Sequence, residues 1–206
     1  MRKIWNAEEK LQFERALQAN GYKLIAGVDE VGRGPLAGPV VCAAVVMPLE
    51  QDQLVIGVDD SKKLSEKRRE ELAEEIKRRA LCYNIVQISP ETIDEINILQ
   101  ATRLGMKRAI EGLNLSPDIV LTDGNMTLDI SMPQRSIIKG DSLSYSIGAA
   151  SIVAKVFRDT MMNEYDERYP AYAFAKNKGY GTAEHIQAIK EYGLCAIHRK
   201  TFTKKF

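Results

Sequence analysis

Acidic residues stand at the ends of three predicted β-strands. The four acids are Asp29, Glu30, Asp123 and Asp141. Each strand that carries them is followed by a glycine or by a short loop. Carboxylates at the end of a buried strand are costly unless they are paired or bind a metal. If the three strands are parallel neighbours, their acids converge at one edge of the sheet, which is where ligands of such sheets gather.

This pattern predicts a site for divalent metal ions. Several carboxylates within a few ångströms repel one another unless cations lie between them. Oxygen ligands without histidine or cysteine favour Mg²⁺ or Mn²⁺ over zinc. A pair of such ions about 4 Å apart suits phosphoryl chemistry, because one ion activates water and the other stabilises the leaving oxygen.

Each acid taken alone has a simpler interpretation. Asp123 is a common turn former, Asp141 is a residue at a helix entry, and Asp29 with Glu30 faces solvent at a strand end. The recurrence at three strand ends favours the shared site. Adjacent strand residues point to opposite faces, so Asp29 and Glu30 share a site only if the strand ends or twists at Glu30.

Asp159 is a further acid, and we leave it outside the metal site. It lies midway along a predicted helix, four residues after Lys155. An ion pair at this spacing accounts for it.

Gly32, Arg33 and Gly34 form a predicted turn directly after the first acids. With Ala37 they match the spacing of a dinucleotide-binding turn. That motif needs a helix immediately after it, whereas residues 40–47 have the pattern of a buried strand. A nucleotide cofactor is therefore not expected. The backbone of the turn can still approach a ligand closely, because glycine has no Cβ.

Basic and aromatic residues supply candidates for the substrate side: Lys62, Lys178 and Tyr180. Such lysines are usually solvated surface, but beside a carboxylate–metal site they would hold phosphates. Tyr180 lies between two glycines, where an exposed ring would stack on a sugar or a base. His185 and His198 have no nucleophile or second ligand near them in the sequence, so we assign them no role.

The spacing of apolar residues predicts a mixed α/β sheet that would hold the acids. Strands are predicted at 25–30, 40–47, 82–88, 119–122 and 135–138, and helices at 5–20, 65–80, 90–113, 146–164 and 183–193. The first two strands form a hairpin around the glycine turn. The third helix carries a break in its periodicity near Asn97.

The totals describe an ordinary globular chain of 206 residues with a net charge of +1. That length suits one domain with a small appendage. The longest apolar run is about as long as a strand, so no membrane span is expected, and the charged N-terminus does not match a signal peptide. Three separated cysteines indicate thiols in a reducing compartment. We expect a cytoplasmic monomer that does not associate with membranes.

The chain resembles bacterial ribonuclease HII over nearly its whole length, and the combination of its motifs in this order is highly specific. The matching segments are Gly27–Val40 (GVDEVGRGPLAGPV), Asp60–Leu64 (DSKKL), Asp123–Asn125 (DGN), Lys139–Asp141 (KGD), Ala149–Asp159 (AASIVAKVFRD) and Lys178–Thr182 (KGYGT). Ribonuclease HIII is less similar, because it has lysine in place of Arg33 and a large additional N-terminal domain.

The resemblance implies a ribonuclease H-like fold, with a five-stranded mixed sheet flanked by helices and a C-terminal helical region. It divides the chain into a peripheral helix (1–22), a catalytic core (23–165) and a substrate-binding region (166–206). It implies cleavage of RNA in RNA–DNA hybrids and cleavage 5′ of single ribonucleotides in duplex DNA, leaving 5′-phosphates, as in ribonucleotide excision repair. The four acids match the family's ligands for Mg²⁺ or Mn²⁺. Gly32, Arg33 and Gly34 match its ribose-sensing turn, and Tyr180 its stacking tyrosine.

Two positions depart from the family pattern. Asn177 stands where a histidine is usual, and the tail from His198 lacks the usual serine and proline. Both are expected at the periphery of substrate binding. Two alternatives remain at this point: a nuclease specific for hybrids that ignores isolated ribonucleotides, and a nucleic-acid-binding module without activity. Four intact acids argue against the second, because clustered negative charge repels phosphates.

Overall fold

Five strands form one sheet in the order β3-β2-β1-β4-β5 in the computed structural model, which describes residues 5–205. The strands are β1 (Ile25–Val31), β2 (Val40–Val46), β3 (Cys82–Ile88), β4 (Ile119–Asp123) and β5 (Gln134–Ile137). β1 and β2 form the predicted antiparallel hairpin, and β2 pairs with β3 in the same way. β1 pairs in parallel with β4, and β4 in parallel with β5. The prediction that the three acid-bearing strands are parallel neighbours is therefore confirmed.

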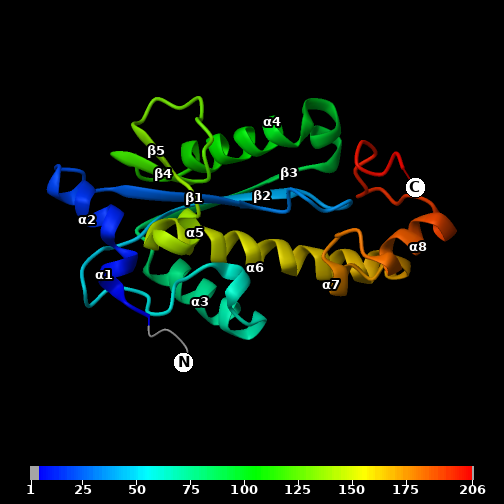
Figure 1. Ribbon diagram of the computed structural model, residues 1–206, viewed down its shortest axis with the longest axis horizontal. Helices are drawn as coiled ribbons and strands as arrows, with labels where there is room; N and C mark the ends of the chain where they lie inside the picture. Colours follow the sequence, from blue (N-terminus) through cyan, green and yellow to red (C-terminus); the bar gives the residue numbers. More distant parts are fainter. Residues whose placement is uncertain (1–4, 206) are drawn as a thin grey trace.

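Helices cover both faces of this sheet and both of its ends (Figure 1). They are α1 (Ala7–Lys10), α2 (Gln12–Ala19), α3 (Glu66–Arg79), α4 (Pro90–Glu111), α5 (Gly140–Leu143), α6 (Tyr145–Arg168), α7 (Phe174–Asn177) and α8 (Ala183–Tyr192), with 3₁₀ turns at Ser61–Lys63 and Pro170–Tyr172. Figure 1 shows α4 on one face and α6 with α3 on the other, while α8 lies near the C-terminal tail. None of the helices in the described part of the chain has the length and hydropathy needed to cross a membrane.

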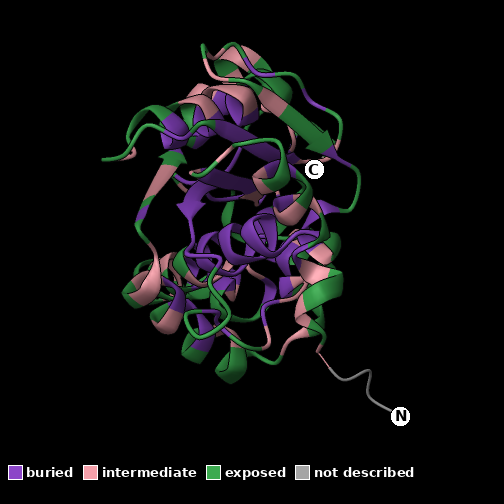
Figure 2. Cartoon of the chain, turned by 90° about the vertical axis from the view of Figure 1, so that its left-hand side faces the viewer, coloured by how far each residue is buried: buried purple, intermediate pink, exposed green. Residues whose placement is uncertain are grey.

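The centre of the sheet is buried from both sides because its strands are almost wholly apolar. All seven residues of β2 are buried, and Figure 2 shows buried strands and α6 at the middle of the molecule. Alternate residues of β1 enter different clusters. Ile25 packs with residues of α6, whereas Ala26 and Val28 pack with Met106 on α4.

Close contact between β1 and α6 depends on one glycine. A Cβ atom on Gly27 would lie 2.1 Å from the backbone carbon of Ser146, in the first turn of α6. No larger residue fits there without moving the helix. Gly27 therefore lets the start of α6 lie directly against the strand that carries Asp29.

Helix starts agree with the capping residues in the sequence. Ser65, Ser89 and Thr182 each accept a hydrogen bond from a backbone N–H of the first turn, as N-cap residues do. Asn97 has a φ of 65° inside α4, which confirms the predicted break.

The other differences from the predicted elements are local. The predicted helix 5–20 is two helices that meet at Leu11. β5 begins and ends one residue earlier than expected, and α6 continues to Arg168. Element ends depend on tertiary contacts more than on periodicity, so differences of this size are expected.

Candidate active site

The four acids lie at one edge of the sheet, at the carboxyl ends of its parallel strands. The fields of Glu30 and Asp123 act on Asp29, and the field of Asp141 acts on Asp123. Asp29 and Asp141 are buried, at 5% and 7% exposed. The edge therefore concentrates four carboxyl groups where little water screens them.

Asp29 and Glu30 belong to opposite faces of β1 by strand alternation. Glu30 has the parity of Val28, which packs toward α4, whereas the side chain of Asp29 receives a hydrogen bond from Ser151 on α6. Of the two alternatives, an end of the strand at Glu30 is excluded, because β1 continues to Val31. Both acids nevertheless interact with Asp123 at the end of the next strand.

Asp141 reaches the edge through a short helix, and its expected position at a strand end is therefore corrected. It is the second residue of α5, which begins after Lys139 adopts a left-handed φ of 60°. Asp123 Oδ1 accepts hydrogen bonds from the backbone N–H of Gly140 at 2.6 Å and of Asp141 at 3.4 Å. Asp123, a candidate metal ligand, thus holds the backbone that carries Asp141, a second candidate ligand.

Burial and mutual repulsion make these carboxyls harder to ionise. Burial, followed by the charges of Glu30 and Asp123, raises the pKa of Asp29 well above its usual value. Burial also raises the pKa of Glu30, although Arg33 opposes this with an ion pair of 3.2 Å between its Nη1 and Glu30 Oε1. Burial and then Asp141 raise the pKa of Asp123. A cation among these groups would relieve both penalties.

The residues present fit a hard divalent cation. Glu30 Oε2 is buried and has no hydrogen-bond partner among the described residues, and every donor atom is a carboxylate oxygen, as Mg²⁺ and Mn²⁺ prefer. No three Asp, Glu, His or Cys side chains in the described part of the chain form a ready-made metal-binding group.

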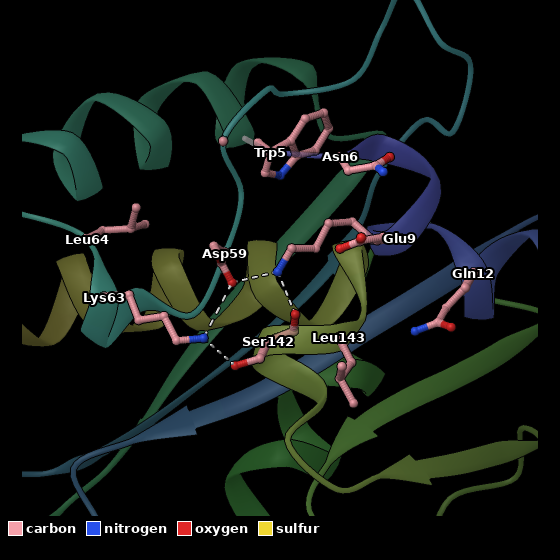
Figure 3. Close-up of a pocket in the computed structure, with 11 residues that line it drawn as sticks. Trp5, Asn6, Glu9, Gln12, Asp59, Lys63, Leu64, Ser142 and Leu143 are labelled. Atoms are coloured by element: carbon pink, nitrogen blue, oxygen red, sulfur yellow. Dashed lines mark hydrogen bonds and ion pairs between the residues drawn. The ribbon is translucent and has the colours of Figure 1, made fainter. Parts of the chain in front are cut away.

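The N-terminal helices support the helix that carries Asp141. Lys10 on α1 donates hydrogen bonds to Asp59 Oδ1 at 2.6 Å and to the carbonyl of Ser142 at 2.5 Å. Figure 3 shows Asp59 and Ser142 in a groove beside α5, together with the hydrogen bond from Lys63 to the Ser142 hydroxyl. On α2, the buried Glu14 accepts a hydrogen bond from Ser144 Oγ at 2.5 Å. The peripheral segment thus fixes α5 from behind.

Of the three predicted substrate-side lysine and tyrosine residues, only Lys62 contacts one of the four acids directly. Lys62 Nζ lies 3.3 Å from Asp141 Oδ2. Partial burial opposes the charged form of Lys62, but Asp141, Asp60 and Asp29 together raise its pKa above the ordinary value. Lys178 donates to Asn163 Oδ1 at 2.5 Å. Tyr180 is 47% exposed, and its ring lies 3.6 Å from the position of a Cβ on Gly34.

Glycine stands at positions 32 and 34 of the turn for two different physical reasons. Gly32 has a φ of 91°, and a Cβ there would lie 2.3 Å from Arg158 Nε, so the fold itself requires glycine. Gly34 lies outside the left-handed region, and a Cβ there would meet only the ring of Tyr180. Gly34 therefore keeps open the space between the turn and the tyrosine.

Asp159 lies in a structural ion-pair network, as its spacing predicts. Its carboxylate contacts Lys155 Nζ at 2.6 Å and Arg69 Nη2 at 3.5 Å. It is 6% exposed, which makes it a useful buried acid for comparison with Asp29.

Sequence reasoning missed a buried polar cluster behind Tyr180. His185 Nε2 and His198 Nε2 are 3.0 Å apart, and His185 Nδ1 lies 2.9 Å from the carbonyl oxygen of Tyr180. Asn177 donates to the carbonyl of Tyr172 and accepts from the N–H of Gly179. Asn177 and His198 are buried, at 6% and 3% exposed, and their place at the periphery of substrate binding stays a prediction.

Comparison with solved structures identifies the class of protein. Ribonuclease HII in a structure of the PCNA:RNase HII complex from Archaeoglobus fulgidus superposes with a TM-score of 0.76 at 28% identity, over 89% of this chain and 95% of that one. Bst-RNase HIII in complex with Mn²⁺ superposes with a TM-score of 0.71 at 20% identity, over 88% and 68%, which shows a common fold. The five-stranded mixed sheet with flanking helices is the fold of a ribonuclease H.

The profile of the Ribonuclease HII family matches residues 26–205. The ribonuclease HII of Caldicellulosiruptor saccharolyticus is 53% identical over 197 residues, which are 96% of this chain and 95% of that protein. The chain belongs to the ribonuclease HII family. It is an endoribonuclease that acts on RNA–DNA hybrids, in a family that uses divalent metal ions.

Proposed function

We propose that this enzyme also cuts duplex DNA on the 5′ side of a single embedded ribonucleotide, leaving a 5′-phosphate. The position of the glycine turn supports this most directly. Residues 32–34 directly follow Asp29 and Glu30, and Tyr180 faces Gly34 across an open space. A ribose bound in that space would place its phosphate beside the acids.

In this proposal Asp29, Glu30, Asp123 and Asp141 hold two Mg²⁺ or Mn²⁺ ions. Bound there, such ions would activate water and stabilise the leaving oxygen. The chain's own groups perform the remaining tasks. Lys62 and Lys178 would bind phosphates, Arg33 keeps Glu30 oriented by its ion pair, and Tyr180 would pack on a sugar or a base.

Mapping of the cut site tests the proposal. A labelled DNA duplex with one ribonucleotide should be nicked at the bond on its 5′ side with Mg²⁺ or Mn²⁺, and the downstream fragment should accept ligation through its 5′-phosphate. Chelation with EDTA should stop the reaction. A nick on the 3′ side, or turnover in EDTA, would contradict the assigned chemistry.

We also propose that the enzyme works as a cytoplasmic monomer with three regions: a supporting segment (1–22), a catalytic core (23–165) and a substrate-binding region (166–206). All three cysteines are free thiols, which suits a reducing compartment. Hydrogen bonds from Arg199 to the carbonyls of Gly32, Arg33 and Gly38 join the last region to the core.

Alanine at the two glycines should separate folding from recognition. Gly32→Ala should lower Tm strongly, because both its backbone conformation and Arg158 oppose a Cβ. Gly34→Ala should leave Tm within a few degrees of the wild type and reduce cleavage at a single ribonucleotide by at least about tenfold, since the methyl group enters the proposed ribose space. Melting curves and initial rates measure the two effects. Full activity in Gly34→Ala would exclude a ribose at that position.

Removing the proposed phosphate-binding lysines should weaken binding without changing what is recognised. Lys62→Ala and Lys178→Ala should each reduce the slope of log affinity against log salt by about 1. Lys77→Ala, on the outer helix α3 where Lys77 pairs with Glu74, is the control and should keep the wild-type slope. A changed preference for ribonucleotides with an unchanged slope would show that Lys62 or Lys178 has a different role.

A further inference from the structure

Arg199, in the C-terminal tail, donates hydrogen bonds to the ribose-sensing turn from inside the protein. Its guanidinium is fully buried and has no carboxylate within ion-pair distance among the described residues. Nη2 donates to the carbonyl of Gly32 at 2.6 Å, Nη1 to the carbonyl of Arg33 at 2.9 Å, and Nε to the carbonyl of Gly38 at 2.9 Å. A buried cation is thus satisfied entirely by backbone oxygens of a single loop.

These contacts set the direction of two N–H groups. In a trans peptide unit the C=O and the following N–H point in opposite directions, and the described chain contains no cis peptide. Because the carbonyls of Gly32 and Arg33 point at Arg199, the N–H groups of Arg33 and Gly34 point away from it. Neither N–H donates to an acceptor among the described residues. Hydrogen bonding of the carbonyls to a cation also polarises these donors.

The tail is fixed on both sides of Arg199, so the guanidinium is held in place before substrate binds. The backbone N–H of Arg199 donates to the carbonyl of Leu36 at 2.8 Å. After it, Asp94 accepts hydrogen bonds from the N–H of Lys200 at 2.7 Å and of Thr201 at 2.9 Å. The ring of Phe202 lies 5.2 Å from the Arg199 guanidinium carbon.

We propose that Arg199 is a positioning residue for ribose recognition, which orients the N–H groups of Arg33 and Gly34 toward the 2′-oxygen of the bound nucleotide. The inference rests on the proposed function, because it assumes that the turn binds a ribose. Lysine cannot replace this arginine, since its single nitrogen cannot reproduce a planar fork that reaches three carbonyls.

Arg158 supplies the matched comparison. It is also fully buried, and it also donates to three backbone carbonyls, those of Ala37, Pro39 and Lys178. None of these belongs to residues 32–34. Arg158→Lys should therefore lower stability as Arg199→Lys does, but only Arg199→Lys should alter recognition of the 2′-oxygen.

The test is competition binding in EDTA, where no cleavage occurs. A fluorescent DNA duplex with one ribonucleotide is displaced by the same unlabelled duplex or by its all-DNA counterpart. We expect the wild type and Arg158→Lys to prefer the ribonucleotide duplex by roughly tenfold, the effect of one or two hydrogen bonds. In Arg199→Lys the preference should fall below about threefold, while the affinity for all-DNA stays the same.

Thermal melts identify the folded variants. If Arg199→Lys does not fold, Phe202→Leu removes only the ring beside the guanidinium and should lower the preference in the same direction by about twofold. An unchanged preference in the folded variant, or an equal loss in Arg158→Lys, overturns the role of Arg199. A wild type that neither cuts nor prefers the ribonucleotide duplex contradicts the proposed function instead.

Discussion

Replacing Asp29 by asparagine is expected to lower the cleavage rate by roughly 10³-fold and to raise the Tm of the metal-free protein. The rate falls because a bound ion contributes several kcal/mol of transition-state stabilisation, and each 1.36 kcal/mol changes the rate tenfold. Stability rises because the carboxylate is buried and repelled by Glu30 and Asp123, whereas asparagine carries no charge.

The sign of the stability change follows from proton linkage. The pKa of Asp29 is higher in the folded protein than its ordinary value of 3.8, so the folded state binds more protons above pH 3.8. Stability without metal therefore falls as the pH rises through the interval between the unfolded and folded pKa values. Asp29→Asn should remove this decline, and its advantage in Tm should be larger at pH 8 than at pH 4.

Calorimetry in EDTA and initial rates with Mg²⁺ measure the two effects. Asp159→Asn is the matched control, because Asp159 is equally buried but is paired with Lys155 and Arg69. This change leaves Lys155 and Arg69 without a carboxylate partner, so Tm should fall while metal-dependent activity persists. Full activity in Asp29→Asn, or a lower Tm in EDTA, would refute the assignment of Asp29 as a metal ligand. Glu30→Gln, Asp123→Asn and Asp141→Asn should likewise abolish or badly impair metal-dependent cleavage while the fold survives.

The cleavage rate, unlike binding in EDTA, is expected to discriminate between a duplex with one ribonucleotide and an all-DNA duplex by about 10⁴-fold or more. The two duplexes differ by a single 2′-OH, and a site built to hydrogen-bond a hydroxyl rejects the deoxy analogue by about 10⁴ to 10⁵, because its polar groups are left unpaired. The turn at residues 32–34 offers two free N–H groups beside Asp29 and Glu30. Without the hydroxyl, these donors would be covered by the sugar and left without an acceptor.

Three matched duplexes measure this discrimination: all-DNA, one ribonucleotide, and a run of ribonucleotides. Wild-type enzyme should cut the last two and leave the first intact. Cleavage of the run alone would instead support an enzyme specific for hybrids. Equal cleavage of all three would eliminate ribose sensing by the turn. Tyr180→Phe should retain more activity than Tyr180→Ala if the ring acts by stacking.

Much of the sheet edge that carries the four acids was predictable, because these residues lie in or directly after strands that the sequence specifies strongly. The apolar runs of β1, β2 and β4 and the caps at Ser65, Ser89 and Thr182 are short-range patterns. The order of strands and helices then requires parallel neighbours, and parallel neighbours bring their carboxyl ends together. The position of Asp141 was less certain because α5 is only one turn long, and its start depends on hydrogen bonds to Asp123.

Local pattern did not reveal the long-range contacts that support α5 and the glycine turn. Lys10 contacts Ser142 across 132 positions, and Arg199 contacts Gly32 across 167. Their acceptors are backbone carbonyls, which every residue carries, so no residue type in the sequence marks them. The tail at His198–Lys205 has the composition of an exposed basic segment, yet Arg199 is fully buried.

The sequence by itself indicated the family through the motifs that resemble ribonuclease HII. It also determined the sheet and the acids at its edge, because hydrophobic periodicity and turn residues act over a few positions. Only the tertiary structure decided why Gly32 and Gly34 differ, that His185 meets His198, and that Arg199 orients the turn. These are pairings of buried polar groups from distant segments. Each pairing depends on which polar groups the packed backbone leaves without a partner. Those groups are defined only once the helices have packed against the sheet.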